Sequence, residues 1–345
     1  MKKSVTIIGG GPSAFLLAAF LDADKFDVTI YEKNKSAGRK FLVAGKGGFN
    51  LTHSESIAKL TKRYTPQGFL DSSLLNFTNT DFRDWLGGIG IPTYIGSSKR
   101  IYPKEGIKPI EVLNAILNSL KEKGTVIKYE QVFTDWDMNN HPVINKKSIP
   151  SDYTVFSLGG KSWKVTGSDG NWLDSFDKKG IETIPFQASN CAFKIDWKKD
   201  FIQQNEGKPL KNIAISCSGK TQKGEAVITK FGLEGNAMYA LSPQVRNELL
   251  KHKKASLYID LKPVLTLDNL LSKISKSNCK NTTETLKRDI KLSSSQINLL
   301  KSSLSKEQYL ETSTLAQYIK KLPIEVIGTA PIDEAISTVG GISLG

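Results

Sequence analysis

A glycine-rich turn lies between an apolar strand and an apolar helix almost at the start of the chain. Residues 4–8 have the composition of a short buried strand, and residues 13–21 carry the small and apolar side chains of a helix that packs on a core. Between them the sequence is Gly9-x-Gly11-x-x-Ala14. In this pattern the first glycine permits a sharp turn, the second lets a pyrophosphate approach the backbone, and the small third residue lets the helix lie close to the strand. The helix N-terminus offers free N–H groups and a positive dipole end, so the turn predicts a dinucleotide site.

An acidic residue follows at the position where the ribose of a dinucleotide is bound. Residues 27–31 have the composition of a second strand, which ends in Glu32, 23 positions after Gly9 (32 − 9). This spacing is typical of a carboxylate that accepts a hydrogen bond from a ribose hydroxyl, and it favours a ribose without a 2′-phosphate. FAD or NAD therefore fits better than NADP. The alternative is an ordinary glycine-rich turn in an α/β core.

The same amino-terminal segment imitates a secretion signal, because Lys2 and Lys3 precede an apolar run. Residues 9–12 would break the apolar helix of a signal, and Asp22 and Asp24 stand where small residues should precede a cleavage site. We therefore expect no signal peptide. No apolar run reaches the roughly 18 residues of a membrane span, so the expected location is the cytoplasm.

A second loop rich in glycine and cations occupies residues 38–53, GRKFLVAGKGGFNLTH. Its glycines at 45, 47 and 48 would expose backbone N–H groups, and its cations Arg39, Lys40 and Lys46 offer charge to a phosphate. A nicotinamide dehydrogenase does not usually need such a loop. A flavin dinucleotide lies extended through its domain, so it needs a second binding surface in addition to the first glycine-rich turn.

Several segments carry a family resemblance that spans most of the chain. GGGPSA (9–14), IYEKN (30–34) and the loop at 38–53 are similar to GGGPAG, LLEKN and GKKLLITGGGRCNLTN; SSKRIYPKE (97–105), VFSLGGKSWKVTGSDGNW (155–172) and TVGGISL (338–344) are similar to GRVFPKS, LATGGxSxPxTGSTGDGY and TxGGV. These are elements of the YhiN/BaiN-type flavoproteins, in the two-dinucleotide-binding-domain flavoprotein group. TKFGLEGNAMYALSP (229–243) resembles a version found in one subfamily.

The sequence also departs from the pattern of this family. The family's Arg-Cys-Asn is Gly48-Phe49-Asn50 here, so no role of that Arg or Cys transfers to this chain. Family members continue past the TxGGV element into a segment that closes over the flavin, whereas the sequence ends at Gly345. We expect either that the sequence is a fragment or that it holds flavin more weakly.

The expected fold class is α/β, a Rossmann-like FAD-binding domain with an inserted substrate domain. Residues 1–187 and 326–345 are assigned to the FAD-binding domain. The insertion covers 188–325, in which 188–265 alternates as an antiparallel sheet does and 266–325 has helical spacing. The apolar strand at 155–160 ends in the pair Gly159 and Gly160, where a cofactor could approach the backbone or where the chain could simply turn.

The cofactor-binding prediction combines these motifs with the resemblance. The predicted residues are Gly9, Gly11, Pro12, Ser13, Ala14, Glu32, Lys33, Arg39, Lys40, Gly45, Gly47, Gly48, Asn50, Gly159, Gly160, Gly340 and Gly341. By resemblance the polar loop 166–170 lies near the flavin ring, although it reads equally as a surface turn. Trp163 and Trp172 bracket this loop, either to flank a planar ring or to fill a core.

Charge and the remaining polar residues bear on partners. The net charge is +14, and residues 251–321 alone carry 14 Lys or Arg against 6 Asp or Glu. This excess suggests an RNA partner, although a solvated helical surface would have the same composition. The three histidines and three cysteines lack metal-ligand spacing, so no metal is predicted. Arg100 and Lys104 could bind an anionic substrate, and His53 could protonate one, but each has an ordinary structural interpretation.

The resulting functional hypothesis is an FAD-dependent oxidoreductase. The resemblance implies reduction of an activated C=C bond, in an RNA uridine or a small molecule. Because no second G-x-G-x-x-G is present, we expect either that NAD(P)H docks transiently as electron donor or that another donor serves. The alternatives are a non-catalytic protein that binds nucleic acid or protein on a truncated flavoprotein fold, and an NAD-dependent dehydrogenase. No catalytic residue and no oligomeric state are predicted.

Overall fold

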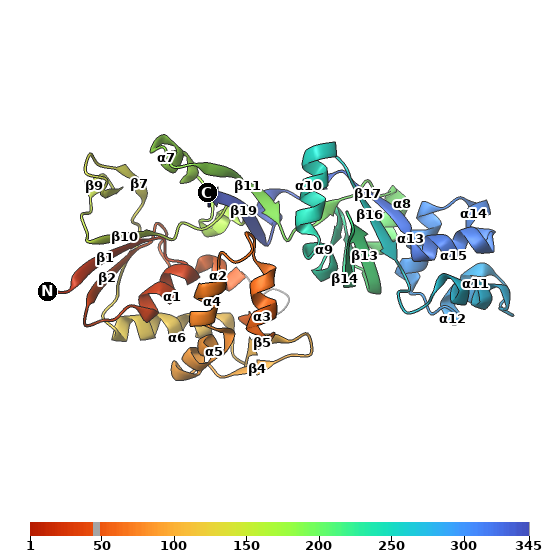
Figure 1. Ribbon diagram of the computed structural model, residues 1–345, viewed down its shortest axis with the longest axis horizontal. Helices are drawn as coiled ribbons and strands as arrows, with labels where there is room; N and C mark the ends of the chain where they lie inside the picture. Colours follow the sequence, from red (N-terminus) through yellow and green to blue (C-terminus); the bar gives the residue numbers. More distant parts are fainter. Residues whose placement is uncertain (44–48, 345) are drawn as a thin grey trace. The chain divides into compact units, whose positions relative to one another are not determined.

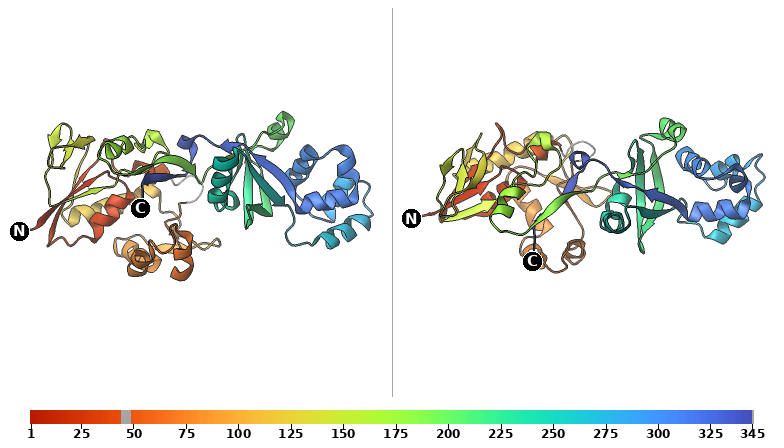
Figure 2. Two further views of the ribbon diagram at one scale, coloured as in Figure 1. Left: turned by 45° about the horizontal axis from the view of Figure 1, so that its top comes forward. Right: turned by 90° about the horizontal axis from the view of Figure 1, so that it is seen from above.

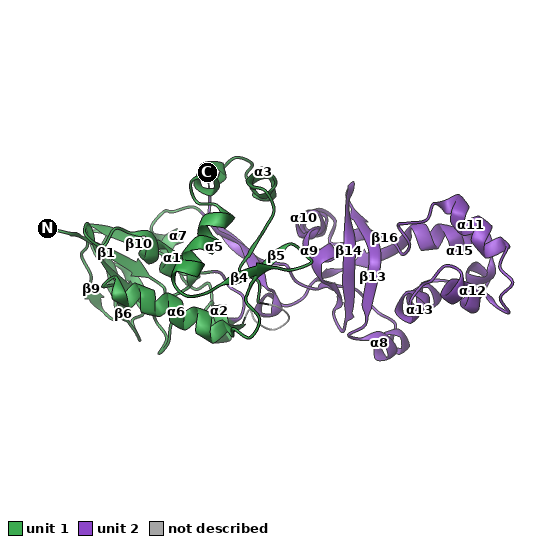
Figure 3. Cartoon of the chain, turned by 90° about the horizontal axis from the view of Figure 1, so that it is seen from below, with its two compact units in different colours: residues 1–159, 164–182 green, residues 160–163, 183–345 purple. Residues whose placement is uncertain are grey.

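The computed structural model describes residues 1–43 and 49–344. Internal contacts divide the chain into two compact units, residues 1–159 with 164–182 and residues 160–163 with 183–345 (Figure 3). Each unit has its own hydrophobic core.

A four-stranded parallel sheet forms the centre of the first unit, in the order β10-β1-β2-β6. Its strands are β1 (Lys3–Ile8), β2 (Phe26–Tyr31), β6 (Val126–Lys128) and β10 (Tyr153–Phe156). The chain runs outward from β1 through β2 to β6 and then returns to the other side of β1 as β10. The strand order therefore reverses between β1 and β10, and in open α/β sheets ligands bind beyond the carboxyl ends of the strands at such a point.

Alternating side chains of these strands face two different layers. Val5 and Ile7 belong to the core beneath helices α1 (Pro12–Phe20), α2 (Arg39–Val43) and α6 (Pro109–Glu122). Ile8 belongs to a smaller core on the other face, together with Tyr31 and Ile144. That face is covered by a three-stranded antiparallel meander, β7 (Phe133–Trp136), β8 (Pro142–Ile144) and β9 (Lys147–Ser148), as Figure 1 shows.

The rest of the first unit is a small antiparallel sheet with short helices. The sheet has the order β3-β5-β4, with β3 (Thr52–His53), β4 (Thr93–Ile95) and β5 (Arg100–Pro103). Helix α5 starts at a capping box, because Thr78 and Asp81 satisfy each other's backbone N–H groups. The helical segments are α3 (Ile57–Leu60), η1 (Thr61–Arg63), α4 (Asp71–Asn76), α5 (Asn79–Gly88), η2 (Lys164–Thr166) and α7 (Leu173–Lys178).

The second unit is built on a seven-stranded sheet in the order β17-β16-β13-β14-β15-β12-β18, antiparallel throughout. Its strands are β12 (Phe193–Lys194), β13 (Pro209–Cys217), β14 (Lys220–Thr229), β15 (Gly232–Glu234), β16 (Ala255–Asp260), β17 (Leu322–Val326) and β18 (Gly328–Thr329). Buried and more exposed side chains alternate along β16, where Ala255, Leu257 and Ile259 are buried. A separate antiparallel ribbon joins β11 (Thr183–Ser189) to β19 (Ser337–Ile342).

Helices complete the second unit, and Figure 2 gives two further views of them. They are α8 (Lys199–Asn205), α9 (Asn236–Tyr239), α10 (Ser242–His252), α11 (Leu267–Ser275), α12 (Thr282–Arg288), α13 (Ser294–Ser303), α14 (Lys306–Leu310), α15 (Thr312–Lys320) and η3 (Ile332–Glu334). Polar side chains at Thr266, Asn281 and Ser293 cap the N-termini of α11, α12 and α13. The helices bury Leu299 and Leu315 in the same core as the sheet.

The expected α/β class is confirmed, because a Rossmann-like parallel sheet is followed by an antiparallel sheet and a helical segment. The predicted domain boundaries at 187 and 326 stay predictions. Contacts group 326–345 with the second unit, since β19 pairs with β11. Among the residues that the structure describes, no helix combines the length and the apolar character needed to cross a bilayer.

Candidate dinucleotide site

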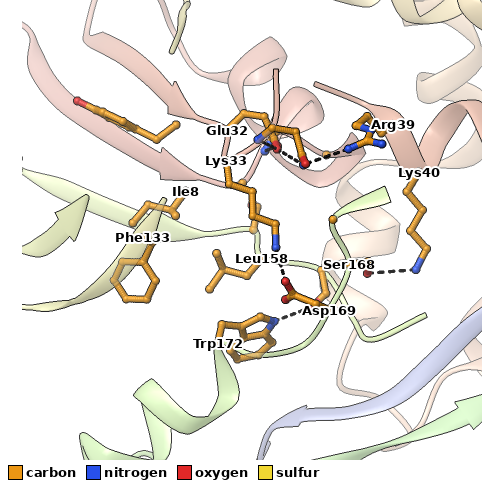
Figure 4. A pocket seen from close by; sticks show the side chains of 18 of the residues that line it. Ile8, Glu32, Lys33, Arg39, Lys40, Phe133, Leu158, Ser168, Asp169 and Trp172 are labelled. Atoms are coloured by element: carbon orange, nitrogen blue, oxygen red, sulfur yellow. Dashed lines mark hydrogen bonds and ion pairs between the residues drawn. The ribbon is translucent and has the colours of Figure 1, made fainter. Parts of the chain in front are cut away.

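A pocket of about 410 Å³ opens at the carboxyl ends of β1, β2 and β10 (Figure 4). All of the residues that line it belong to the first unit. Ile8, Phe133 and Leu158 form an apolar wall, and polar and charged side chains from the loops after β1 and β2 line much of the remainder. This is the position at which the strand order reverses, so the sheet itself creates the crevice.

The turn after β1 has the backbone that its sequence predicts. Gly9 has φ +103°, and its N–H donates to the Tyr31 carbonyl at 2.8 Å. A Cβ at Gly9 would lie 2.3 Å from the Ser157 carbonyl oxygen, so only glycine allows β1 and the end of β10 to approach this closely. A Cβ at Gly11 would meet no described atom within 4 Å and would instead occupy the pocket. The space beside Gly11, before the N-terminus of α1, therefore fits a phosphate.

Glu32 is held rigidly at the next strand end. It is only 7% exposed, yet it lines the pocket. Its Oε2 accepts from the Gly10 N–H at 2.7 Å, and its Oε1 accepts from the Asn34 backbone N–H at 2.8 Å and side-chain Nδ2 at 2.6 Å. A carboxylate has about four acceptor positions, so these three bonds leave capacity for a ribose hydroxyl. The carboxylate is thus fixed in place and can still bind a ligand.

A loop from far along the chain lies against this end of the pocket. Lys33 Nζ forms an ion pair with Asp169 Oδ2 at 2.8 Å, and Lys40 Nζ donates to Ser168 Oγ at 3.3 Å. A Cβ at Gly167 would lie 2.5 Å from Asn34 Nδ2, so the loop backbone is close to the residues after β2. The structure places this loop beside Lys33, Asn34 and Lys40. That residues 166–170 lie near the flavin ring stays a prediction.

Charge and burial shift the pKa values of two ionisable groups in this loop contact. Partial burial acts to raise the pKa of Asp169, but the hydrogen bond from Lys33 and the backbone N–H of Asn171 outweigh it and lower that pKa. Burial lowers the pKa of Lys40. Trp172 closes the same side, since its Nε1 donates to the Gly159 carbonyl at 3.0 Å.

Many of the predicted cofactor residues meet in this pocket. Those that line it are Gly9, Gly11, Pro12, Ser13, Glu32, Lys33, Arg39, Lys40 and Gly159. Ala14 is a fully buried residue of α1, which fits its predicted packing role. Arg39 Nη1 donates to Asn34 Oδ1 at 3.0 Å and so joins the group around Glu32.

The other predicted residues lie elsewhere. Asn50 is exposed and is not part of the pocket lining. Gly160, Gly340 and Gly341 belong to the second unit, where a Cβ at Gly160 would lie 2.2 Å from Thr338 Oγ1. Gly45, Gly47 and Gly48 lie outside the described residues.

Some pocket residues are not among the predicted cofactor-binding residues. Residues 131–134, at the start of the meander, line the pocket although nothing in their composition marks them. Ser157 and Leu158 follow β10 and enter because β10 lies beside β1. Asn34 follows Glu32 by two residues, and at this spacing its short amide side chain can donate a hydrogen bond to the carboxylate.

Two of the histidines contact residues of their own segments, and the roles of His53, Arg100 and Lys104 toward a substrate stay predictions. His53 Nδ1 accepts from the Glu55 N–H at 3.1 Å, which fixes the imidazole within its own loop. His141 lies 3.2 Å from Asp137 in the meander. Within residues 1–43 and 49–344, no three His, Cys, Asp or Glu side chains form a cluster that could bind a metal ion.

Three curated proteins are similar in sequence to this chain. A ribosomal RNA dihydrouridine synthase from Haemophilus influenzae is 25% identical over 68% of this chain and 60% of its own. A 3-dehydro-bile acid delta(4,6)-reductase from Clostridium scindens is 25% identical over 75% of this chain and 64% of its own. A ribosomal RNA dihydrouridine synthase from Escherichia coli is 22% identical over 68% of this chain and 59% of its own. The aligned region is thus about three fifths of the length of each of these relatives.

The family match is broader than these pairwise similarities. The family described as HI0933-like protein Rossmann domain matches residues 3–345. That range includes the turn after β1, the carboxylate of Glu32 and the loop that carries Asp169, as well as the whole second unit. The chain therefore belongs to the HI0933-like family and, with it, to the YhiN/BaiN-type flavoproteins that its motifs resemble.

Proposed function

We propose that the protein is an FAD-dependent oxidoreductase that reduces an activated C=C bond with electrons from NAD(P)H. The observation that carries the proposal is the fixed carboxylate of Glu32 beside the open backbone at Gly11, in a pocket of a flavoprotein-family chain. This pair provides the two contacts that an adenine dinucleotide requires, one for its ribose and one for its pyrophosphate.

The residues of the pocket fit the ADP half of FAD. The N–H groups at the start of α1 would face the pyrophosphate, and Glu32 would accept from the ribose. Lys33 and Arg39 add positive charge on the same side. Asp169 pairs with Lys33, so the loop at 166–172 would hold the bound nucleotide against Glu32. FAD, when bound, supplies the hydride chemistry, and the chain supplies position and electrostatics.

The type of reaction is inferred from the relatives. A dihydrouridine synthase saturates the C=C bond of a uracil ring, and a delta(4,6)-reductase saturates C=C bonds of a steroid-like acid. Both substrates have double bonds activated by a carbonyl group. Reduction of an activated C=C bond is the reaction common to the two, and we assign it to this chain.

Absorption spectroscopy tests the proposal directly. The purified protein, reconstituted with FAD if necessary, should show the visible bands of oxidised flavin, and NADPH or NADH should bleach them under anaerobic conditions. Gly11→Leu should lack these bands, because position 11 lines the pocket and a Cβ there meets no other described atom within 4 Å. A protein that stays colourless after reconstitution would contradict the proposal and support a non-catalytic binding protein, whereas NADH binding without flavin would indicate a nicotinamide dehydrogenase.

A further inference from the structure

A second cavity, of about 470 Å³, lies entirely within the second unit. Four lysines line it, Lys208, Lys211, Lys262 and Lys291, and no carboxylate is among its lining residues in the described chain. The remaining lining includes hydroxyl and amide side chains such as Ser294 and Asn212. A concave surface with four cations and no acid is a site for an anion.

Local backbone structure brings these lysines together from three segments of the sequence. Lys208 directly precedes β13, and Lys211 lies where the register of β13 against β14 shifts between Leu210 and Ile213. Such a bulge changes the direction in which a side chain points. Lys262 follows β16, the other neighbour of β13, and its Nζ donates to the Lys291 carbonyl at 3.3 Å. Lys291 itself has φ +59° just before α13.

The positive charge of this cavity is not neutralised by the protein. Within the described part of the chain, none of the four ammonium groups forms an ion pair with a carboxylate. Of the acids two residues away in sequence, Asp260 pairs with Lys320 at 2.6 Å and Asp289 accepts from Ser277 Oγ at 2.6 Å, and neither these two nor Glu206 lines the cavity. Burial lowers the pKa of Lys262, and the charge of Lys291 lowers it further. Ammonium groups that repel one another in this way are stabilised in their charged form when an anion binds between them.

The chemistry of the lining favours a phosphate. Lysine ammonium groups act as mobile point charges that bind phosphate oxygens without reading a base. The first N–H groups of α13, at Ser294 and Ser295, have no acceptor within the helix and border the same cavity. Lys208, Lys211 and Lys291 are exposed, so a long polyanion can reach them.

We propose that this cavity binds a backbone phosphate of an RNA substrate. The inference rests on the proposed function and specifies its substrate class, an RNA strand and not a free small molecule. It agrees with the excess of cations over acids in residues 251–321, 14 against 6. The cavity would hold the strand through its phosphates, which carry no sequence information.

The test compares two double variants with the same loss of charge. Lys211→Gln/Lys291→Gln removes two lysines of the cavity. Lys276→Gln/Lys306→Gln removes two exposed lysines that do not line it, one directly after α11 and one at the start of α14. Binding of a fluorescein-labelled RNA hairpin is measured by anisotropy over a range of salt concentrations. The cavity variant should bind about tenfold more weakly at low salt and lose about 2 from the slope of log K against log salt, whereas the control should change little.

Three readouts separate the outcomes. Equal weakening by both variants, or no RNA binding at low salt by the wild type, overturns the inference. A thermal shift assay measures whether inorganic phosphate raises the melting temperature. If phosphate protects the wild type but not the cavity variant, and neither protein binds RNA, the RNA assignment is overturned. Flavin absorbance and bleaching are recorded on the same samples. A colourless protein whose RNA binding still depends on Lys211 and Lys291 would contradict the oxidoreductase proposal and support the phosphate site. Melting temperatures of both variants check that folding is unchanged.

Discussion

Glu32 Oε2 accepts a hydrogen bond from the Gly10 N–H at 2.7 Å, which ties the carboxylate at the end of β2 to the turn after β1. A Cβ at Gly10 would lie 2.8 Å from the same oxygen, so the absence of a side chain at position 10 is what allows the contact. Two neighbouring strand ends are thereby fixed relative to each other before any ligand arrives. Preorganisation of this kind lowers the ordering cost of binding.

The two glycines of the turn should respond differently to substitution. Gly11→Leu should abolish flavin binding and change the free energy of unfolding by only about 1 kcal/mol, because position 11 has ordinary backbone angles and faces open space. Gly9→Ala should cost about 3 kcal/mol or more, because its Cβ would strike the Ser157 carbonyl in a backbone that strongly favours glycine. Urea denaturation and visible absorbance measure the two effects. A Gly11→Leu protein that retains full flavin would contradict the phosphate assignment.

Replacing Glu32 should damage both the turn and the ligand site. In Glu32→Gln an amide NH₂ replaces one carboxylate oxygen, so either the Gly10 N–H or the Asn34 groups lose their acceptor. We expect a loss of about 1–3 kcal/mol in unfolding free energy, since those donors are buried. Flavin affinity should fall as well. Glu122→Gln, an exposed acid at the end of α6, is the control, and a Glu32→Gln protein that behaves like this control would refute the role of the carboxylate.

The sequence predicted the first wall of the pocket and missed the second. Residues 9–14 and Glu32 follow a local pattern in which each residue type has one physical task, so their positions can be read directly. Phe133 lies outside every such pattern, and Leu158, although it belongs to the segment 155–172, is not itself a predicted pocket residue. They reach the pocket because β10 returns beside β1 and because the meander covers Ile8 and Tyr31, and both facts depend on contacts far apart in the sequence. Long-range pairing is what a local pattern cannot specify.

The Lys33–Asp169 ion pair should control the loop at 166–172. Asp169→Asn removes the charge, and because the pair is partly exposed the cost in global stability should be at most about 1 kcal/mol. The local effect should be larger: faster hydrogen exchange in the loop and weaker flavin binding. Lys33→Gln should match it, and the double variant should be no worse than either one, as expected for two partners of one interaction. Additive effects would show that the two residues act separately.

The same pair predicts an acid limit for flavin retention. The pKa of Asp169 in the folded protein is lowered below its usual value, so the stabilising effect of the ion pair is complete above about pH 4 and is lost as the pH falls through the folded value. Flavin release followed by fluorescence should therefore rise below about pH 4. In Asp169→Asn the release should depend less on pH in this range, and an unchanged profile would exclude Asp169 as the titrating group.

Asp137 should set the acid stability of the meander that covers the sheet. Its carboxylate accepts from Ser148 Oγ at 2.6 Å and from the backbone N–H groups of Asn139 and His141. The Ser148 bond is the largest cause that lowers the pKa of Asp137 from its usual 3.8 to about 2.

Because the folded pKa lies below the unfolded one, the contribution of Asp137 is complete above pH 3.8 and disappears as the pH falls through about 2. Ser148→Ala should raise the pKa of Asp137 and move the acid loss of the meander to higher pH. NMR titration of the Asp137 carboxyl and hydrogen exchange of β7 and β8 between about pH 5 and pH 2 measure the two changes. Asp137→Asn should remove the acid dependence in β7 and β8 while the parallel sheet keeps its own. If the carboxyl titrates at its usual value in the wild type, the hydrogen bonds of this turn do not stabilise the charged form.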